Sequence, residues 1–381
     1  MPRGRAAPPA RGGARLRVLF VVRGGGRGYA AQALALAAML RRRGHTVAGA
    51  LVGVDRWGDA PEFFRRGLGA PVEAIESVGL GADARAVGRG LDRITTALDR
   101  AEPDVVVNVY EGLMGAHALL RGVDVPTVVV GRPFMTGVPG PPSGGPARRL
   151  AARARAALVG AGAAERLALS FYDARRDGVC VTPPLLGDDL FALAGRPRDG
   201  SVLVHLADAR AAPALAAWSD RRPDVRLHVF GPVAPHAHSA ALTFHGLSGR
   251  AFVRRMAVAR AVVCTAGFDT VSEALWLGTP ALLVPAPGQQ RDAADAAAVG
   301  AGLVSGTLDL DVLLDYLGGP RPHAQATTAR FRQWVACAEG RAAGAVERAA
   351  GLAPVQNAAG GDGLAEPADV GVLSLGAPGV G

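Results

Sequence analysis

The sequence predicts an α/β protein with two Rossmann-like domains whose parallel sheets face each other across a cleft. A strand, a glycine-rich loop, a helix and a second strand follow one another over residues 16–54, and a similar unit recurs over residues 261–285. Between these units, the apolar run 201–206 begins a new series of strands and helices. The 381 residues are enough for two domains of ordinary size, each with its own core.

Composition and apolar periodicity set the expected boundaries. Residues 1–15 are rich in Arg, Pro, Ala and Gly, and residues 351–381 are rich in Gly, Ala and Pro, so both ends are predicted to be disordered. Between them we expect, in order, a first domain over 16–184, a linker over 185–200, a second domain over 201–326 and a long helix over 327–350.

The charge and cysteine content narrow the function classes. The chain contains no lysine, so arginine carries the formal net charge of +9. Such a surplus suits an anionic partner, such as nucleotide phosphates or an acidic membrane face, although a biased Ala, Gly and Arg composition contributes to it. Three isolated cysteines have neither metal-site nor disulfide spacing, which predicts a reduced, cytoplasmic protein. No stretch reaches the roughly 18 apolar residues of a membrane span, so we expect a soluble or membrane-peripheral protein.

Residues 261–285 form the most informative stretch. The apolar run 261–264 has the length of a buried strand, and a glycine turn at 266–268 leads into an apolar-periodic helix. This helix stops at 278–280, and a second buried strand follows. The helix is therefore predicted to begin at the carboxyl edge of a parallel sheet. Its unpaired N–H groups and the positive end of its dipole suit a diphosphate.

Segments 264–274 and 277–285 resemble the donor-binding region of GT-B glycosyltransferases, in particular the peptidoglycan lipid-intermediate N-acetylglucosaminyltransferase and its relatives. The resemblance implies that Gly267 and Thr270 hold the nucleotide diphosphate and that Glu273 binds the ribose hydroxyls. A carboxylate can accept two hydrogen bonds from a vicinal diol. The other interpretation is structural, because Thr270 and Glu273 have the spacing of a capping box.

The loop after this unit departs from the family pattern. Gln289 matches the family, but Arg291, Asp292 and Asp295 stand where glutamate, glutamine and asparagine are usual. Asp292 is predicted to accept hydroxyls of the donor sugar, and Arg291 to pair with a phosphate or a carboxylate. The resemblance therefore implies either an unusual sugar or weakened donor binding.

The first glycine loop resembles the amino-terminal turn of the same enzymes. Gly24, Gly26 and Gly28 match it, whereas Tyr29 replaces a histidine that in many relatives acts as the acceptor base or lies beside it. A tyrosine with a pKa near 10 is a poor base at neutral pH. Tyr29 also takes the third glycine position of a dinucleotide fingerprint, which disfavours a nicotinamide or flavin oxidoreductase. The other interpretation of the glycines is a tight turn without a ligand.

Glu111 is the second candidate for the acceptor base. It follows the predicted strand 105–107, at the edge where open α/β sheets place their sites. Partial burial would raise its pKa toward that of a useful base. The alternative is a solvated loop glutamate.

The acceptor side of the first domain contains two further features. The loop 136–146 is long enough to act as a lid over the acceptor. The arginine-rich helix that follows, 147–158, contacts an anionic membrane surface in one interpretation and is an ordinary solvated helix in the other.

The predicted function is transfer of a sugar from a nucleotide-sugar donor, which the resemblance implies is linked to UDP, to a small or lipid-linked hydroxyl acceptor. The resemblance implies inversion, no metal and no cofactor, and a terminal helix 327–350 that crosses back to the first domain. His236 and His238 have no carboxylate at ligand spacing, which also argues against a metal. We expect no nucleic-acid partner. Two alternatives remain: a catalytically silent nucleotide-sugar binder, and a sugar-nucleotide epimerase of the same fold.

Overall fold

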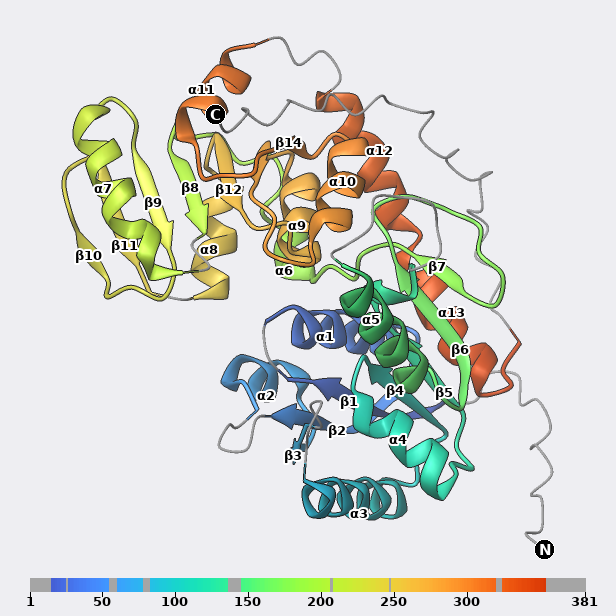
Figure 1. Ribbon diagram of the computed structural model, residues 1–381. Coiled ribbons are helices and arrows are strands. Elements are labelled where there is room, and N and C mark those ends of the chain that lie inside the picture. The colour runs from blue at the N-terminus through green and yellow to red at the C-terminus, as the bar shows by residue number, and fades with distance from the viewer. Residues whose placement is uncertain are drawn as a thin grey trace, which may run out of the picture.

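The computed structural model describes residues 15–24, 27–54, 60–77, 83–135, 145–205, 208–246, 248–319 and 324–353. It contains two α/β lobes, each built on a seven-stranded sheet (Figure 1). The strand order is β3-β2-β1-β4-β5-β6-β7 in the first lobe and β10-β11-β9-β8-β12-β13-β14 in the second. All strand pairs are parallel except β10 with β11. The predicted fold class is confirmed.

Helices cover both faces of the first sheet, which explains why its central strands are continuous apolar runs with no polar face. Residues 18–22 and 105–109 are buried throughout. The elements of this lobe are β1 (Arg17–Arg23), α1 (Arg27–Arg42), β2 (Thr46–Val54), α2 (Glu62–Leu68), β3 (Val72–Glu76), α3 (Ala84–Ala101), β4 (Val105–Val109), α4 (Gly112–Arg121), β5 (Thr127–Val130), η1 (Arg132–Met135), α5 (Pro146–Val159), β6 (Ala163–Leu169) and β7 (Cys180–Thr182).

The second lobe repeats this plan with shorter strands. The strand 261–264, next to the middle strand of this sheet, is fully buried, as its apolar run predicts. The remaining elements are α6 (Asp188–Phe191), β8 (Val202–His205), η2 (Ala209–Ala211), α7 (Ala212–Arg221), β9 (Leu227–Phe230), β10 (His236–Ala237), β11 (Leu242–His245), α8 (Gly249–Met256), β12 (Ala261–Cys264), α9 (Phe268–Leu277), β13 (Ala281–Leu283), α10 (Gln290–Ala298), β14 (Gly302–Val304), α11 (Leu310–Gly318), α12 (Ala324–Ala336) and α13 (Ala338–Ala349).

The chain returns to the first lobe at its end. The helix expected over 327–350 is divided at Cys337 into α12, which packs against α9, and α13, which packs against α1 and β6. The buried carboxylate of Glu347 anchors α13, because Arg43 donates to its two oxygens at 2.8 and 2.9 Å and the His45 ring lies 3.0 Å away. This crossing ties the two ends of the described chain together.

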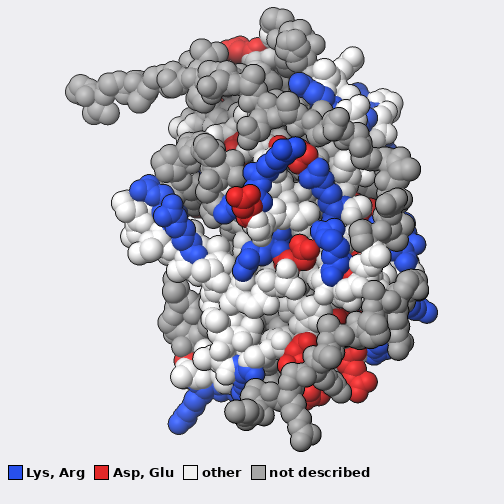
Figure 2. Space-filling view, turned by 90° about the vertical axis from the view of Figure 1, so that its right-hand side faces the viewer, with Lys and Arg blue, Asp and Glu red and all other residues white. Residues whose placement is uncertain are grey.

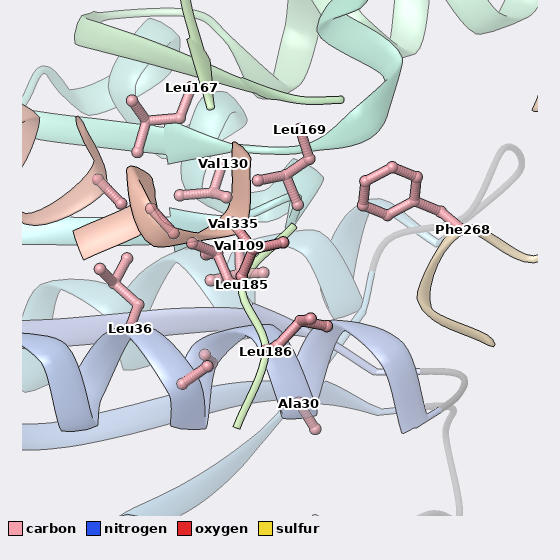
Figure 3. Close-up of a cluster of buried hydrophobic side chains, with 14 of the residues drawn as sticks. Ala30, Leu36, Val109, Val130, Leu167, Leu169, Leu185, Leu186, Phe268 and Val335 are labelled. Atoms are coloured by element: carbon pink, nitrogen blue, oxygen red, sulfur yellow. The ribbon is translucent and has the colours of Figure 1, made fainter. Parts of the chain in front are cut away.

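Apolar packing joins the lobes. The largest core cluster includes Leu36 and Val130 of the first lobe, Leu186 of the connecting segment, and Phe268 and Val335 of the second (Figure 3). Because this cluster is continuous, the two lobes share buried apolar contacts and are not joined by the connecting segment alone. The relative position of the facing loops is therefore held by buried apolar contact.

Some expectations concern residues outside this description. Most of the predicted acceptor lid and most of both predicted disordered ends lie outside the described residues. Within the described ranges, no helix combines the length and the apolar character that crossing a bilayer requires.

Candidate functional site

The two predicted ligand loops meet between the lobes. Gly28 in the first turn of α1 lies so close to Asp269 in the first turn of α9 that a side-chain carbon on Gly28 would stand 2.0 Å from a carboxylate oxygen. Gln32, one turn further along α1, donates from Nε2 to Asp269 Oδ1 at 2.7 Å. The N-termini of two helices, with their unpaired N–H groups, thus face each other across the cleft.

The start of α9 excludes the capping-box interpretation. Gly267 is the N-cap and has no side chain to cap with, so Thr270 is the third residue of the helix and Glu273 lies in its middle. Gln289 Nε2 would stand 4.0 Å from a side-chain carbon on Gly267. The structure therefore brings the predicted donor residues Gly267 and Gln289 together, and leaves the first amides of α9 without a side-chain cap at Gly267.

Glu273 is buried and paired with the first lobe. Nη2 of Arg27, the first residue of α1, lies 2.5 and 2.6 Å from its two carboxylate oxygens. Burial raises the pKa of Glu273 to about 7, although the Arg27 charge and its hydrogen bond oppose the rise. The Arg27 side chain also fills the space beside Gly249, where an added carbon would stand 2.3 Å from its Cδ. Arg27 is a site residue that the sequence analysis missed.

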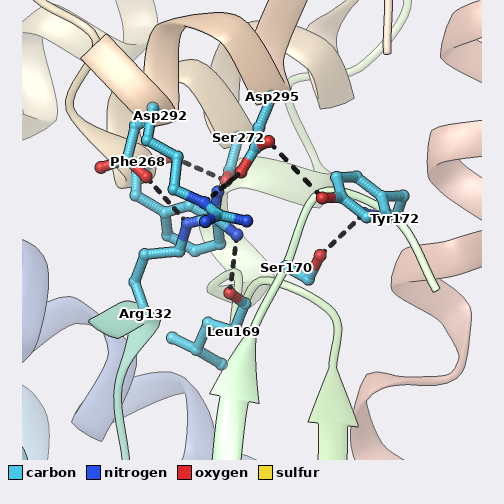
Figure 4. A network of polar contacts seen from close by, with 9 residues as sticks. Arg132, Leu169, Ser170, Tyr172, Phe268, Ser272, Asp292 and Asp295 are labelled. Atoms are coloured by element: carbon cyan, nitrogen blue, oxygen red, sulfur yellow. Dashed lines mark hydrogen bonds and ion pairs between the residues drawn. The ribbon is translucent and has the colours of Figure 1, made fainter. Parts of the chain in front are cut away.

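A second arginine crosses between the lobes at α10. Arg132 of the first lobe donates from Nε to Asp292 Oδ1 at 2.9 Å and from Nη2 to Asp295 (Figure 4). Its Nη1 donates to the Leu169 carbonyl at 3.2 Å, and the Tyr172 hydroxyl lies 3.5 Å from Asp295 Oδ1. Asp292, which was predicted to bind the sugar, is thus held through one oxygen by a residue of the opposite lobe.

Aromatic rings enclose the same guanidinium. Arg132 lies 5.2 Å from the ring centre of Phe171 and 5.3 Å from that of Phe268, and the two rings are 4.6 Å apart. Contacts of a guanidinium with aromatic rings are favourable and strengthen as water is excluded. Arg132 is therefore fixed by polar and apolar neighbours from both lobes.

Glu111 is not the solvated loop residue of the alternative interpretation. Glu111 is 1 % exposed and forms the N-cap of α4. The Leu113 amide donates to its Oε1 at 3.1 Å, and the Ser77 hydroxyl donates to its Oε2 at 3.0 Å. Burial raises its pKa, against the effect of these two hydrogen bonds. The predicted rise is present, but both oxygens are already engaged within the first lobe, where Oε2 also lies against Gly53 at the end of β2.

Tyr29 lies at the cleft but is unsuited to take a proton. Its ring stacks on that of Tyr110, with 6.1 Å between centroids and 10° between planes, and the Arg23 guanidinium lies 5.7 Å from its centre. Burial raises the pKa of the Tyr29 phenol further above its ordinary value near 10. The phenol therefore stays protonated at neutral pH.

The loop glycines have packing reasons of their own. A side-chain carbon on Gly24 would stand 1.6 Å from the carbonyl oxygen of Gly53, so the two backbones touch there. Gly28 is required by the closeness of Asp269, whereas Gly26 lies outside the described residues. The tight-turn interpretation thus explains Gly24, and the cleft explains Gly28.

The histidines of the second lobe have ordinary partners. His236 Nδ1 lies 2.9 Å from the Ala234 carbonyl, and His238 Nε2 lies 3.1 Å from Asp220. In the part of the chain that the structure describes, no three His, Cys, Asp or Glu side chains are grouped as a metal ion would need.

Comparison with known proteins identifies the family of the chain. Residues 84–318, more than half of the chain, match the model of glycosyl transferase family 1. The chain belongs to that family. It is a glycosyltransferase, and the predicted enzyme class is confirmed. No curated protein matches the chain.

Solved structures show that this glycosyltransferase has the GT-B fold. LpCGTa in complex with UDP is 16% identical with a TM-score of 0.65, over 88% of this chain and 99% of that one. MurG of Acinetobacter baumannii is 17% identical with a TM-score of 0.52, over 87% and 99%. A putative UDP-N-acetylglucosamine 2-epimerase from Listeria monocytogenes is 13% identical with a TM-score of 0.59, over 88% and 96%.

Proposed function

We propose that this glycosyltransferase transfers a sugar from a UDP-sugar to a hydroxyl acceptor in the cleft between its lobes. The observation that carries the proposal is Glu273, a buried carboxylate on the cleft side of α9, one turn beyond the helix start. The amides from Gly267 onward receive the diphosphate, and Glu273 accepts hydrogen bonds from the two pentose hydroxyls. The structural likeness to a protein solved with UDP supports uracil as the base of the donor nucleotide.

Arg27 has two successive roles in this proposal. It neutralises Glu273 in the structure. When the pentose hydroxyls engage that carboxylate, the guanidinium turns to the donor diphosphate, which lies at the adjacent helix start. The departing diphosphate gains negative charge as its bond to the sugar breaks, so Arg27 and the α9 amides stabilise the transition state more than the bound donor.

Asp269 replaces the expected base. Its carboxylate touches Gly28, next to the position where the resemblance implies a base, and burial raises its pKa against the effects of Gln32 and Arg27. The acceptor hydroxyl transfers its proton to Asp269 while its oxygen bonds to the anomeric carbon. The diphosphate leaves with the electron pair of the broken bond. This single displacement inverts the anomeric centre and needs no metal.

The donor sugar is placed between Gln289 and Asp292. Gln289 already lies beside Gly267, where the sugar end of the diphosphate would be. Arg132 holds Oδ1 of Asp292, which fixes the orientation of the carboxylate and leaves Oδ2 to accept a sugar hydroxyl. Arg132 thereby acts as a positioning residue.

A panel of radiolabelled UDP-sugars tests the function. Purified full-length protein is expected to bind UDP in calorimetry and to transfer or slowly hydrolyse one UDP-sugar. The Glu273→Gln variant is expected to bind UDP about tenfold more weakly, and Asp269→Asn to lose turnover. Glu339→Gln serves as the matched control, since Glu339 pairs with Arg42 outside the cleft.

Two other outcomes would overturn the proposal. Interconversion of the free UDP-sugar without an acceptor would identify an epimerase. Binding without transfer, hydrolysis or interconversion would identify a silent nucleotide-sugar binder, an alternative that the protonated phenol of Tyr29 favours.

A further inference from the structure

Three arginines on the acceptor side of the cleft have no hydrogen-bond or ion-pair partner among the residues that the structure describes. Seen from the right-hand side of Figure 1, arginine side chains form a band around the middle of the molecule, with carboxylates between them (Figure 2). Within the described residues, Arg23, Arg148 and Arg155 have neither a hydrogen bond nor an ion pair, apart from the contact of Arg23 with the Tyr29 ring. By contrast, Arg27 and Arg132 are both paired with carboxylates across the cleft.

Helix α5 directs two of these arginines toward the cleft. Arg148 and Arg155 are seven residues apart, which places them on one face of the helix. At one end of this face, Arg148 Nη1 would stand 3.4 Å from a side-chain carbon on Gly288 of the second lobe. At the other end, Val159 is buried in the first lobe. Arg153 lies on a different face of α5 and is exposed.

The arginines surround a flat aromatic wall. Tyr29 and Tyr110 stack nearly parallel, and the Arg23 guanidinium lies over the outer ring. The charges of Arg23 and Arg155 both lower the pKa of the Tyr29 phenol, which places Arg155 near this pair as well. Arg23 and Arg155 are half-buried, which limits the water that competes with an anionic ligand for their unpaired guanidinium groups.

We propose that the acceptor carries an anionic group, a carboxylate or a phosphate, which Arg23 and Arg155 bind beside the tyrosine wall while the reacting hydroxyl lies at Asp269. This inference rests on the proposed function, because only that function identifies the first-lobe side of the cleft as the acceptor side. These arginines follow β1 and lie on α5, within the first lobe, whereas the diphosphate site begins at α9 in the second. Arg148 would guide the anion in at the cleft mouth.

Calorimetry with phenyl phosphate, benzoate and the neutral benzyl alcohol tests this proposal, with and without saturating UDP. Wild type is expected to bind at least one of the two anions and not the alcohol. Arg23→Met and Arg155→Met are expected to weaken anion binding by about tenfold each. Arg155→Lys keeps the charge and is expected to retain most of the affinity, and Arg153→Met is the matched control on the same helix.

The possible results separate the two proposals. No binding of either anion, or equal binding to wild type and both Met variants, would overturn the anionic acceptor. Loss of UDP affinity in Arg23→Met and Arg155→Met would show that these arginines serve the donor instead. Anion binding without any UDP binding would contradict the proposed function and leave the anion site standing.

Discussion

The cleft is crossed by two arginine bridges of different character. Arg132 is 10% exposed and contacts two carboxylates, a carbonyl and two aromatic rings. Arg27 is 31% exposed and engages a single carboxylate, Glu273, through one nitrogen. The burial of Glu273 raises its pKa to about 7 even beside this cation. The buried, many-sided contacts of Arg132 therefore stabilise the relative position of the lobes. The more exposed contact of Arg27 with Glu273 is easier for a ligand to replace.

The largest effect is expected beside the exchangeable bridge. Asp269→Asn removes the proposed base but keeps an oxygen that can accept from Gln32. We expect kcat to fall by about 10²- to 10⁴-fold with UDP affinity close to wild type. Steady-state kinetics and calorimetry measure the two quantities. Asp189→Asn removes a second carboxylate whose charge acts on Arg27 and is the control, and equal losses in both variants would refute the assignment.

The Arg132 bridge is tested by unfolding in urea. Arg132→Met leaves the half-buried Asp292 and the buried Asp295 beside each other without their shared cation. We expect the free energy of unfolding to fall by about 3–5 kcal/mol. Arg42→Met breaks an exposed bridge between α1 and the segment that contains Glu339, and is expected to cost less than about 1 kcal/mol. Similar losses of unfolding free energy in the two variants would contradict a structural role of Arg132.

The pH dependence of stability tests the state of Glu273. Its pKa is about 7 in the folded protein against an ordinary value of 4.5, so the folded state binds more protons between these values. Stability is therefore expected to fall as pH rises through this window, by about 3 kcal/mol. Glu273→Gln has no carboxyl group to titrate at this position, so its free energy of unfolding should rise relative to that of wild type between pH 5 and pH 8. A constant difference would mean that Glu273 titrates normally.

The smallest effect is expected for Arg27. Because Arg27 is 31% exposed and Glu273, with a pKa of about 7, is able to take up a proton, Arg27→Met is expected to lower the free energy of unfolding less than Arg132→Met does. We expect UDP affinity to fall by about tenfold, because one charged hydrogen-bond donor to the diphosphate is lost. Tighter UDP binding in this variant would show that Arg27 only blocks Glu273, and would contradict its proposed role at the diphosphate.

The sequence predicted the fold best where apolar runs are continuous. The runs 18–22 and 261–264 are buried on both faces, and such strands are visible without knowing their neighbours. Strand β6 has no such run, because Glu165 and Arg166 interrupt it. It is a strand because β5 and β7 pair with it on both sides, which no local pattern reveals.

The site was predictable only in its local parts. Gly267 and Glu273 belong to one short segment, so their proximity followed from the sequence. The partner of Glu273 lies 246 residues away, and no periodicity connects Arg27 to it. Glu111 shows the converse limit, since its raised pKa was anticipated but its orientation depends on Ser77, 34 residues earlier. The capping-box interpretation was wrong because it assumed a helix start at Thr270.

The hydrogen bonding of Glu273 to the pentose is tested most directly by calorimetry. UDP and 2′,3′-dideoxy-UDP are each titrated into wild type and Glu273→Gln. Wild type is expected to bind UDP at least about tenfold more tightly than the dideoxy analogue, whereas the variant should bind the two alike. If the two hydroxyls contribute equally in both proteins, or if the variant binds UDP as wild type does, Glu273 does not hold the donor.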